Sequence, residues 1–265
     1  MSEAMDKRYL DAVKKWRERD IQTVADLDAA LSDFRILYAY HSNKLENAGL
    51  DLLRTREIFD DEHINNYSGS LVNIFEVQNQ KDCYEYLKYR IVDKEPLSTK
   101  LIKKVHGILN HDCYDEARWK KGERPGEYKV NHYGVAENAG MSPEDVPDEM
   151  EYICSEVNSV DTDDPIKLLK AAAFFHCNFE YIHGFADGNG RAGRTLMNYF
   201  LMINNMPPAI IYEEDKATYY MALAVFDKTE NMDGFVQMMK EVTVKTWEKR
   251  TRRPSLGNIT KLLDS

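Results

Sequence analysis

The chain has 265 residues, of which 43% are hydrophobic, and a formal net charge of −10 at pH 7. This length and composition allow a substantial buried core, and the negative charge argues against a general nucleic-acid binder. Residues 1–11 are charged, and no run of 18 apolar residues occurs, so we expect neither a signal peptide nor a membrane span. The four cysteines form no Cys-x-x-Cys pair, which favours reduced thiols in a cytoplasmic protein. Delivery by a specialised secretion apparatus stays open.

The first strongly periodic segment follows Thr23, which can cap a helix. Apolar residues recur along it at three- and four-residue steps, at Leu27, Leu31, Phe34, Leu37 and Tyr38. Residues 47–49 are Asn-Ala-Gly, and Asn and Gly tolerate the left-handed conformation that ends helices. We therefore expect a helix that carries residues 42–47, Ser-Asn-Lys-Leu-Glu-Asn, at its end.

Two more helices are expected before residue 110. Residues 75–91 carry apolar side chains at a mixed helical spacing. After Pro96, Ser98 opens an amphipathic helix whose apolar face is formed by Leu101, Ile102, Val105, Ile108 and Leu109. We assign His106 to the far side of this helix and His111 to the following turn, both without a catalytic role.

The helical period is lost between residues 118 and 146. Residues 126–130 and 133–135 flank the polar pair Asn131-His132 and alternate enough for a β-hairpin. The exposed edge of such a hairpin is a template for an added strand from a partner. An ordinary surface hairpin is the alternative.

Helices return after residue 146 and dominate the rest of the chain, so the expected fold class is mainly α. Residues 147–157 form one helix, and Asp164-Pro165 is a cap that opens a buried helix leading to His183. A second central helix follows residue 195 and ends at residues 204–208, and further helices are expected at 219–226 and 235–242.

Residues 183–194, His-Gly-Phe-Ala-Asp-Gly-Asn-Gly-Arg-Ala-Gly-Arg, connect the two central helices. Gly188 and Gly190 let the backbone approach a ligand, and the helix start that follows them attracts anions. Arg191 and Arg194 are three residues apart, so both guanidiniums can bind the same diphosphate or triphosphate. This spacing indicates a site that handles phosphate groups.

Two other residues of the same segment carry chemistry. Asp187 offers the single carboxylate that Mg²⁺ needs when phosphate oxygens and water complete its octahedron. His183 can accept a proton from a hydroxyl that attacks the phosphate. A glycine turn before a helix would explain the glycines alone, but not the His, the Asp and the two Arg together.

The segment resembles the signature of the Fic family, His-x-Phe-x-Asp/Glu-Gly-Asn-Gly-Arg-x-x-Arg, and every fixed position is present. The one departure is Gly184, where many members carry Pro. The resemblance implies a helical bundle around a central helix-loop-helix, with the short β-hairpin as a flap. It divides the chain into N-terminal helices with an inhibitory helix (1–50), a catalytic core (51–245) and a basic tail (246–265). The basic residues near 249–253 indicate a solvated helix end and linker, or a segment that contacts a partner or a second copy.

The resemblance implies transfer of AMP from ATP to a side-chain hydroxyl of a target protein. His183 would be the general base, and Asp187 would bind Mg²⁺. The phosphates would be bound by Gly188, Asn189, Gly190, Arg191 and Arg194, with Arg194 on the γ-phosphate. Phe185 would anchor the loop in the core.

Residues 42–47 resemble the Fic inhibitory motif Ser/Thr-x-x-x-Glu-Gly/Asn. The resemblance places Glu46 against the phosphate site, paired with Arg194, and so implies an enzyme that is autoinhibited at rest. In relatives the same glutamate supports removal of AMP from modified targets. A solvated Glu four residues after Ser42 is the alternative.

The target protein would bind along the flap at about residues 126–138, and we expect no nucleic acid or membrane partner. Self-modification and a homo-oligomer stay open. A different functional class also stays open, a non-catalytic module that senses a nucleotide or acts as a scaffold. His183 favours the enzyme, because a binding module needs no base at this position.

Overall fold

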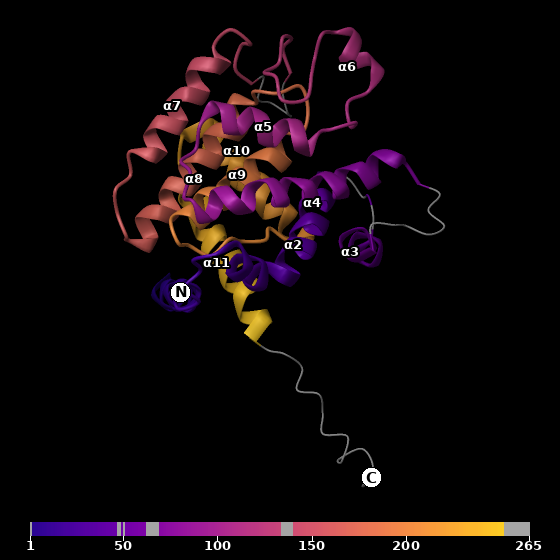
Figure 1. The fold of residues 1–265 in the computed structure, drawn as a ribbon. Helices are drawn as coiled ribbons and strands as arrows, with labels where there is room; N and C mark the ends of the chain where they lie inside the picture. The colour runs from indigo at the N-terminus through magenta and orange to yellow at the C-terminus, as the bar shows by residue number, and fades with distance from the viewer. Residues whose placement is uncertain (1, 47–48, 50, 62–68, 134–139, 252–265) are drawn as a thin grey trace.

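The computed structural model describes residues 2–46, 49, 51–61, 69–133 and 140–251 (Figure 1). Within these ranges the chain forms helices joined by turns, and no β-strand. The α-helices are α1 (Ser2–Arg17), α2 (Val24–Glu46), α3 (Leu52–Asp61), α4 (Leu71–Val92), α5 (Thr99–Leu109), α6 (Glu116–Lys120), α7 (Val146–Asn158), α8 (Pro165–Ile182), α9 (Asn189–Ile203), α10 (Lys216–Thr229) and α11 (Asp233–Thr251). A 3-10 helix, η1 (Glu213–Asp215), precedes α10.

The expected mainly α fold class is confirmed, and the helices predicted at 75–91, 98–109 and 147–157 correspond to α4, α5 and α7. The short helix α6 lies partly in the segment that we expected to be irregular. Residues 126–133 of the predicted flap form turns rather than a strand, and residues 134–138 lie outside the described ranges. The β-hairpin therefore stays a prediction.

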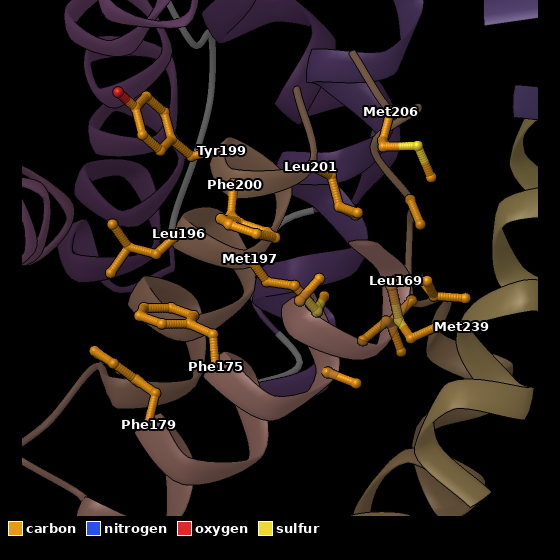
Figure 2. Packing of buried hydrophobic residues seen from close by; sticks show 14 of the residues in the cluster. Leu169, Phe175, Phe179, Leu196, Met197, Tyr199, Phe200, Leu201, Met206 and Met239 are labelled. Atoms are coloured by element: carbon orange, nitrogen blue, oxygen red, sulfur yellow. The ribbon is translucent and has the colours of Figure 1, made fainter. Parts of the chain in front are cut away.

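The two central helices, α8 and α9, pack closely against each other. Asp164 starts α8, because its Oδ1 accepts hydrogen bonds from the N–H groups of Ile166 (2.8 Å) and Lys167 (3.2 Å). A Cβ at Gly193 of α9 would lie 2.9 Å from the Phe179 ring, so this glycine permits the close approach of the two helices. Figure 2 shows the aromatic and aliphatic side chains of α8 and α9 in the core.

The first and last helices meet beside this pair, where α1 packs against α11 (Figure 1). The Trp247 ring lies edge-on to Trp16, with centroids 5.0 Å apart, and stacks on Phe34 of α2 at 6.1 Å. Its Nε1 donates a hydrogen bond to the Pro208 carbonyl (2.8 Å). Because Trp247 is buried in α11, the predicted tail boundary at residue 246 falls inside a packed helix. The division at residue 50 stays a prediction.

We predict that Trp247→Ala destabilises the protein by about 3–5 kcal/mol, because it removes a large ring from a packed core. Trp119, which is 46% exposed, provides the matched control, and Trp119→Ala should change stability by less than about 1 kcal/mol. Urea unfolding followed by circular dichroism measures both changes. Equal losses in the two variants would contradict the docking of α11 against α1 and α2.

Candidate active site

The loop between α8 and α9 is shaped by two left-handed residues and one buried ring. His183 ends α8 at φ +50°, and Gly188 precedes α9 at φ +74°. Between them, Phe185 is fully buried and anchors the loop in the core. The loop therefore joins the end of α8 to the start of α9 within a few residues.

Asn189 fixes the position of His183. Its Oδ1 accepts the Phe185 N–H (3.0 Å), and its Nδ2 donates to the Phe185 carbonyl (2.8 Å) and lies 3.1 Å from Nε2 of His183. Because Oδ1 is used by an N–H donor, Nδ2 is the amide's donor and Nε2 of His183 must accept. The imidazole therefore carries its proton on Nδ1, and the lone pair of Nε2 accepts the Asn189 N–H. The side chain of Asn189 is thus engaged within the loop.

The environment keeps His183 neutral. Burial and, next, the Lys129 ammonium lower its pKa to about 4, while Asp187 and Glu46 act in the opposite direction. At neutral pH the ring is therefore an uncharged base, able to take a proton at Nε2.

Asp187 lies at the exposed rim of the site, with 44% of its side chain accessible. Its Oδ1 accepts the Gly188 N–H (2.7 Å), and its Oδ2 contacts Nη2 of Arg118 (2.8 Å). Among the residues that the structure describes, no three His, Cys, Asp or Glu side chains converge on one point. A single accessible carboxylate fits Mg²⁺ bound together with phosphate oxygens and water, provided that the metal shares or displaces the Arg118 contact.

Gly188 and Gly190, at the start of α9, each lie close to a side chain from another helix. A Cβ at Gly188 would lie 2.1 Å from Oδ1 of Asn110, and a Cβ at Gly190 would lie 2.2 Å from Oε1 of Glu46. The positive φ of Gly188 also favours glycine there, whereas the neighbour at Gly190 is the end of the Glu46 side chain. At Gly190 the space is taken by a carboxylate directly over the first turn of α9, where a helix attracts anions.

The two arginines of the loop have different partners. Arg191 is 4% exposed, its Nη1 lies 3.1 Å from Oε1 of Glu76, and its Nη2 donates to Oδ1 of Asn110 (3.0 Å). It therefore ties α9 to α4 and α5. The sequence predicts that both guanidiniums bind the same phosphate group. In this structure they contact different carboxylates, Glu76 and Glu46.

Arg194 connects α9 to the end of α2. Its Nη2 contacts Oε1 of Glu46 at 2.8 Å and the Ser42 carbonyl at 3.0 Å, and its Nε donates to Oγ of Ser42 (3.2 Å). The arginine is 2% exposed, whereas 31% of the Glu46 side chain is accessible. Burial acts to raise the pKa of Glu46, but the charge and hydrogen bond of Arg194, together with the charges of Arg191 and Lys216, outweigh it, so the pKa lies below its ordinary value. Glu46 is therefore ionised at neutral pH.

Several residues of the site were missed in the sequence: His106, Asn110, Glu76 and Arg118. The assignment of His106 to the far side of its helix is wrong, because the side chain is fully buried against Phe185. The spacing carried a signal. His106 and Asn110 follow Ile102 at four-residue steps and so belong to the apolar face of α5, where a polar residue must have a buried partner.

Comparisons with known proteins relate this geometry to one family. Residues 96–201 match the Fic/DOC family. The chain is 28% identical over 221 residues to the protein adenylyltransferase Fic of Nematostella vectensis, and 28% identical over 230 residues to protein adenylyltransferase fic-1 of Caenorhabditis elegans. These alignments cover 82% and 84% of this chain but 49% and 43% of the relatives, so the chain spans about half their length.

Solved structures show the fold. A Fic domain-containing signalling protein from Bacteroides thetaiotaomicron superposes with a TM-score of 0.75 at 23% identity, over 91% of this chain and 94% of that one. A structure of Fic-1 from C. elegans gives a TM-score of 0.73 at 22% identity, over 94% and 73% of the two chains. The helical bundle around α8 and α9 is therefore the Fic fold.

We predict that Gly188→Ala lowers stability by at least about 1–2 kcal/mol, because alanine is strained at a left-handed φ and its methyl group meets Asn110. Gly234→Ala is the control, since a Cβ there meets nothing within 4 Å, and its effect should stay within about 1 kcal/mol. Urea unfolding of both variants measures the difference. A neutral Gly188→Ala would show that the loop has another conformation.

Proposed function

Because residues 96–201 match the Fic/DOC family, we propose that this chain is a protein adenylyltransferase, which transfers AMP from ATP to a hydroxyl side chain of a target protein. The observation that carries this proposal is the neutral His183 imidazole beside the glycine-lined start of α9. A base adjacent to an anion site is what attack of a hydroxyl on a phosphate requires. The names of the relatives support the same reaction class.

In the proposed reaction the Asn189 N–H releases Nε2 of His183, and Nε2 takes the proton of the target hydroxyl while the hydroxyl oxygen bonds to the α-phosphorus of ATP. The bond between the α-phosphorus and its bridging oxygen breaks, and pyrophosphate leaves. The backbone amide of Gly190 and the Arg194 guanidinium hold the phosphates, and the Gly188 amide joins them once Asp187 releases it. Asp187 would hold Mg²⁺, which when bound neutralises charge on the phosphates. Most of the catalytic effect would come from positioning and charge stabilisation.

Glu46 makes this site autoinhibited in our proposal. Its carboxylate lies over Gly190 and occupies Arg194, so a γ-phosphate would have to enter against a like charge and without its guanidinium. The accessible fraction of the Glu46 side chain leaves it free to be displaced without unfolding the core. Once displaced, the same carboxylate could orient a water molecule and support removal of AMP from a modified target.

The target protein would lie along the predicted flap, residues 126–138, next to His183. We keep self-modification and a homo-oligomer as parts of the proposal, and we place the protein in the cytoplasm. Within the described ranges, none of the helices combines the length and the apolar character that crossing a membrane requires. The competing hypothesis is a nucleotide sensor or scaffold without catalysis. Such a module would need no base at position 183.

We predict that Glu46→Gly raises labelling of the chain itself or of lysate proteins by α-labelled ATP by about tenfold or more, because a charge-assisted contact with Arg194 is lost. Glu46→Gln, which keeps the shape and removes the charge, should give an intermediate rise. His183→Ala in the Glu46→Gly background should abolish labelling. The absence of labelling in Glu46→Gly would favour the non-catalytic alternative, and labelling that survives His183→Ala would contradict the role of His183 as the base. Equal labelling with and without Glu46 would remove only the inhibition.

We predict that kcat/KM of the Glu46→Gly variant is nearly level between about pH 6 and pH 8 with respect to His183. The imidazole must be neutral, and its pKa lies at about 4, so protonation begins well below this range. The Glu46 carboxylate acts to raise the pKa of His183, so its removal lowers that pKa further and the ring stays neutral over this range. Initial rates of AMP transfer across this range test the expectation. A halving near pH 6.5, the ordinary histidine pKa, would contradict it.

A further inference from the structure

His106 of α5 lies under the catalytic loop, although it is not part of the Fic signature. It is fully buried, and its ring stacks on Phe185 with centroids 3.7 Å apart and planes 5° from parallel. Nε2 of His106 lies 2.8 Å from the Asp187 carbonyl, and Nδ1 accepts the Gly126 N–H at 2.9 Å. One imidazole therefore contacts both the loop that carries Asp187 and the segment at which the predicted flap begins.

These contacts fix the protonation of the ring. The Gly126 N–H can only donate, so Nδ1 is unprotonated and Nε2 carries the hydrogen that is donated to the Asp187 carbonyl. Burial also lowers the pKa of His106 to about 3, so the ring stays neutral. A neutral ring in one tautomer is a rigid link with one donor and one acceptor.

The backbone around Gly126 is built to reach this link. Gly126 has φ +86°, and a Cβ there would lie 3.0 Å from the Lys103 carbonyl and 3.3 Å from Cα of Gly107. Two glycines thus let the segment lie directly on α5. Three residues further along, the Lys129 N–H donates to the Gly184 carbonyl (2.9 Å), beside His183. These two hydrogen bonds attach the described part of the flap segment to the site, and His106 makes the first.

We propose that His106 is a positioning residue for AMP transfer. By bonding to both, it fixes the position of the flap segment relative to the loop that carries Asp187. This inference rests on the proposed function, because the flap segment would hold the target hydroxyl and the loop would hold the nucleotide. Packing alone does not account for the residue. An apolar ring would stack on Phe185 equally well, but it would leave the Gly126 N–H without its acceptor and the Asp187 carbonyl with only the longer bond from the Tyr114 hydroxyl (3.4 Å).

Two conservative substitutions separate the two bonds. The Oδ1 of an asparagine can reproduce the acceptor at the place of Nδ1, and the Nε2 of a glutamine can reproduce the donor at the place of Nε2. His106→Asn thus keeps the Gly126 bond and loses the Asp187 bond, and His106→Gln does the reverse. His111→Gln is the control, since this side chain lies just beyond the end of α5 and is 74% exposed.

The variants are made in the full chain carrying Glu46→Gly and compared by three measurements. Calorimetry with Mg²⁺ and a non-hydrolysable ATP analogue reports on the loop, and amide hydrogen exchange of residues 124–133 reports on the flap segment. Steady-state AMP transfer reports on the alignment of the two. Thermal melting identifies a variant that fails to fold, and in that case the remaining variant still tests one of the two bonds.

His106→Asn should weaken binding of the analogue by about tenfold and leave exchange at residues 124–133 slow, because one buried hydrogen bond to the loop is lost. His106→Gln should speed that exchange by about tenfold and change analogue binding by less than about threefold. Both should lower kcat. Equal changes of both measurements in the two variants, or none in either, would overturn the proposal. An inactive Glu46→Gly parent would instead refute the proposed function, while binding and exchange would still test the two bonds.

Discussion

The site depends on one ion pair, between Arg194 of α9 and Glu46 at the end of α2. Arg194 is almost completely buried, and a buried guanidinium without an anion is strongly destabilised. The anion in this structure is a carboxylate of the chain itself, held over Gly190 at 2.8 Å from the guanidinium. The start of α9 favours any anion at that position. In our proposal a carboxylate and a phosphate compete for one place, and this competition would keep the loop closed to ATP at rest.

Buried hydrogen bonds hold the backbone of the loop, whereas the contacts of Glu46 with Arg194, of Arg118 with Asp187 and of Asn189 with His183 would have to be released in the proposed reaction. The loop is fixed from below by Asn189 and Phe185 and from the side by α5. On that helix His106 holds the Asp187 carbonyl, and Asn110, one turn later, accepts a hydrogen bond from Arg191. These bonds lie inside the core and fix groups that are expected to meet ATP. In contrast, Asp187 and Glu46 are partly accessible, which is where a metal ion and an incoming phosphate must enter.

The sequence predicted local features well and long-range contacts only through the family resemblance. Helical periodicity located α4, α5, α7, α8 and α9, because each buries a face that repeats every three or four residues. The same periodicity cannot say which buried polar residues meet across helices. Neither the Arg191–Glu76 contact nor the role of Arg118 beside Asp187 has a sequence signature, because each joins elements far apart in the chain. His106 was misplaced because its polarity was given more weight than its position on the apolar face.

The most direct test of the competition compares ATP with ADP as ligands. Isothermal calorimetry in the presence of Mg²⁺ would measure the affinity of each nucleotide for the unaltered chain and for Glu46→Gly. If Glu46 occupies the place of the γ-phosphate on Arg194, its removal should strengthen ATP binding much more than ADP binding, because only ATP carries that group. An equal gain for the two nucleotides, or no gain for either, would contradict the account.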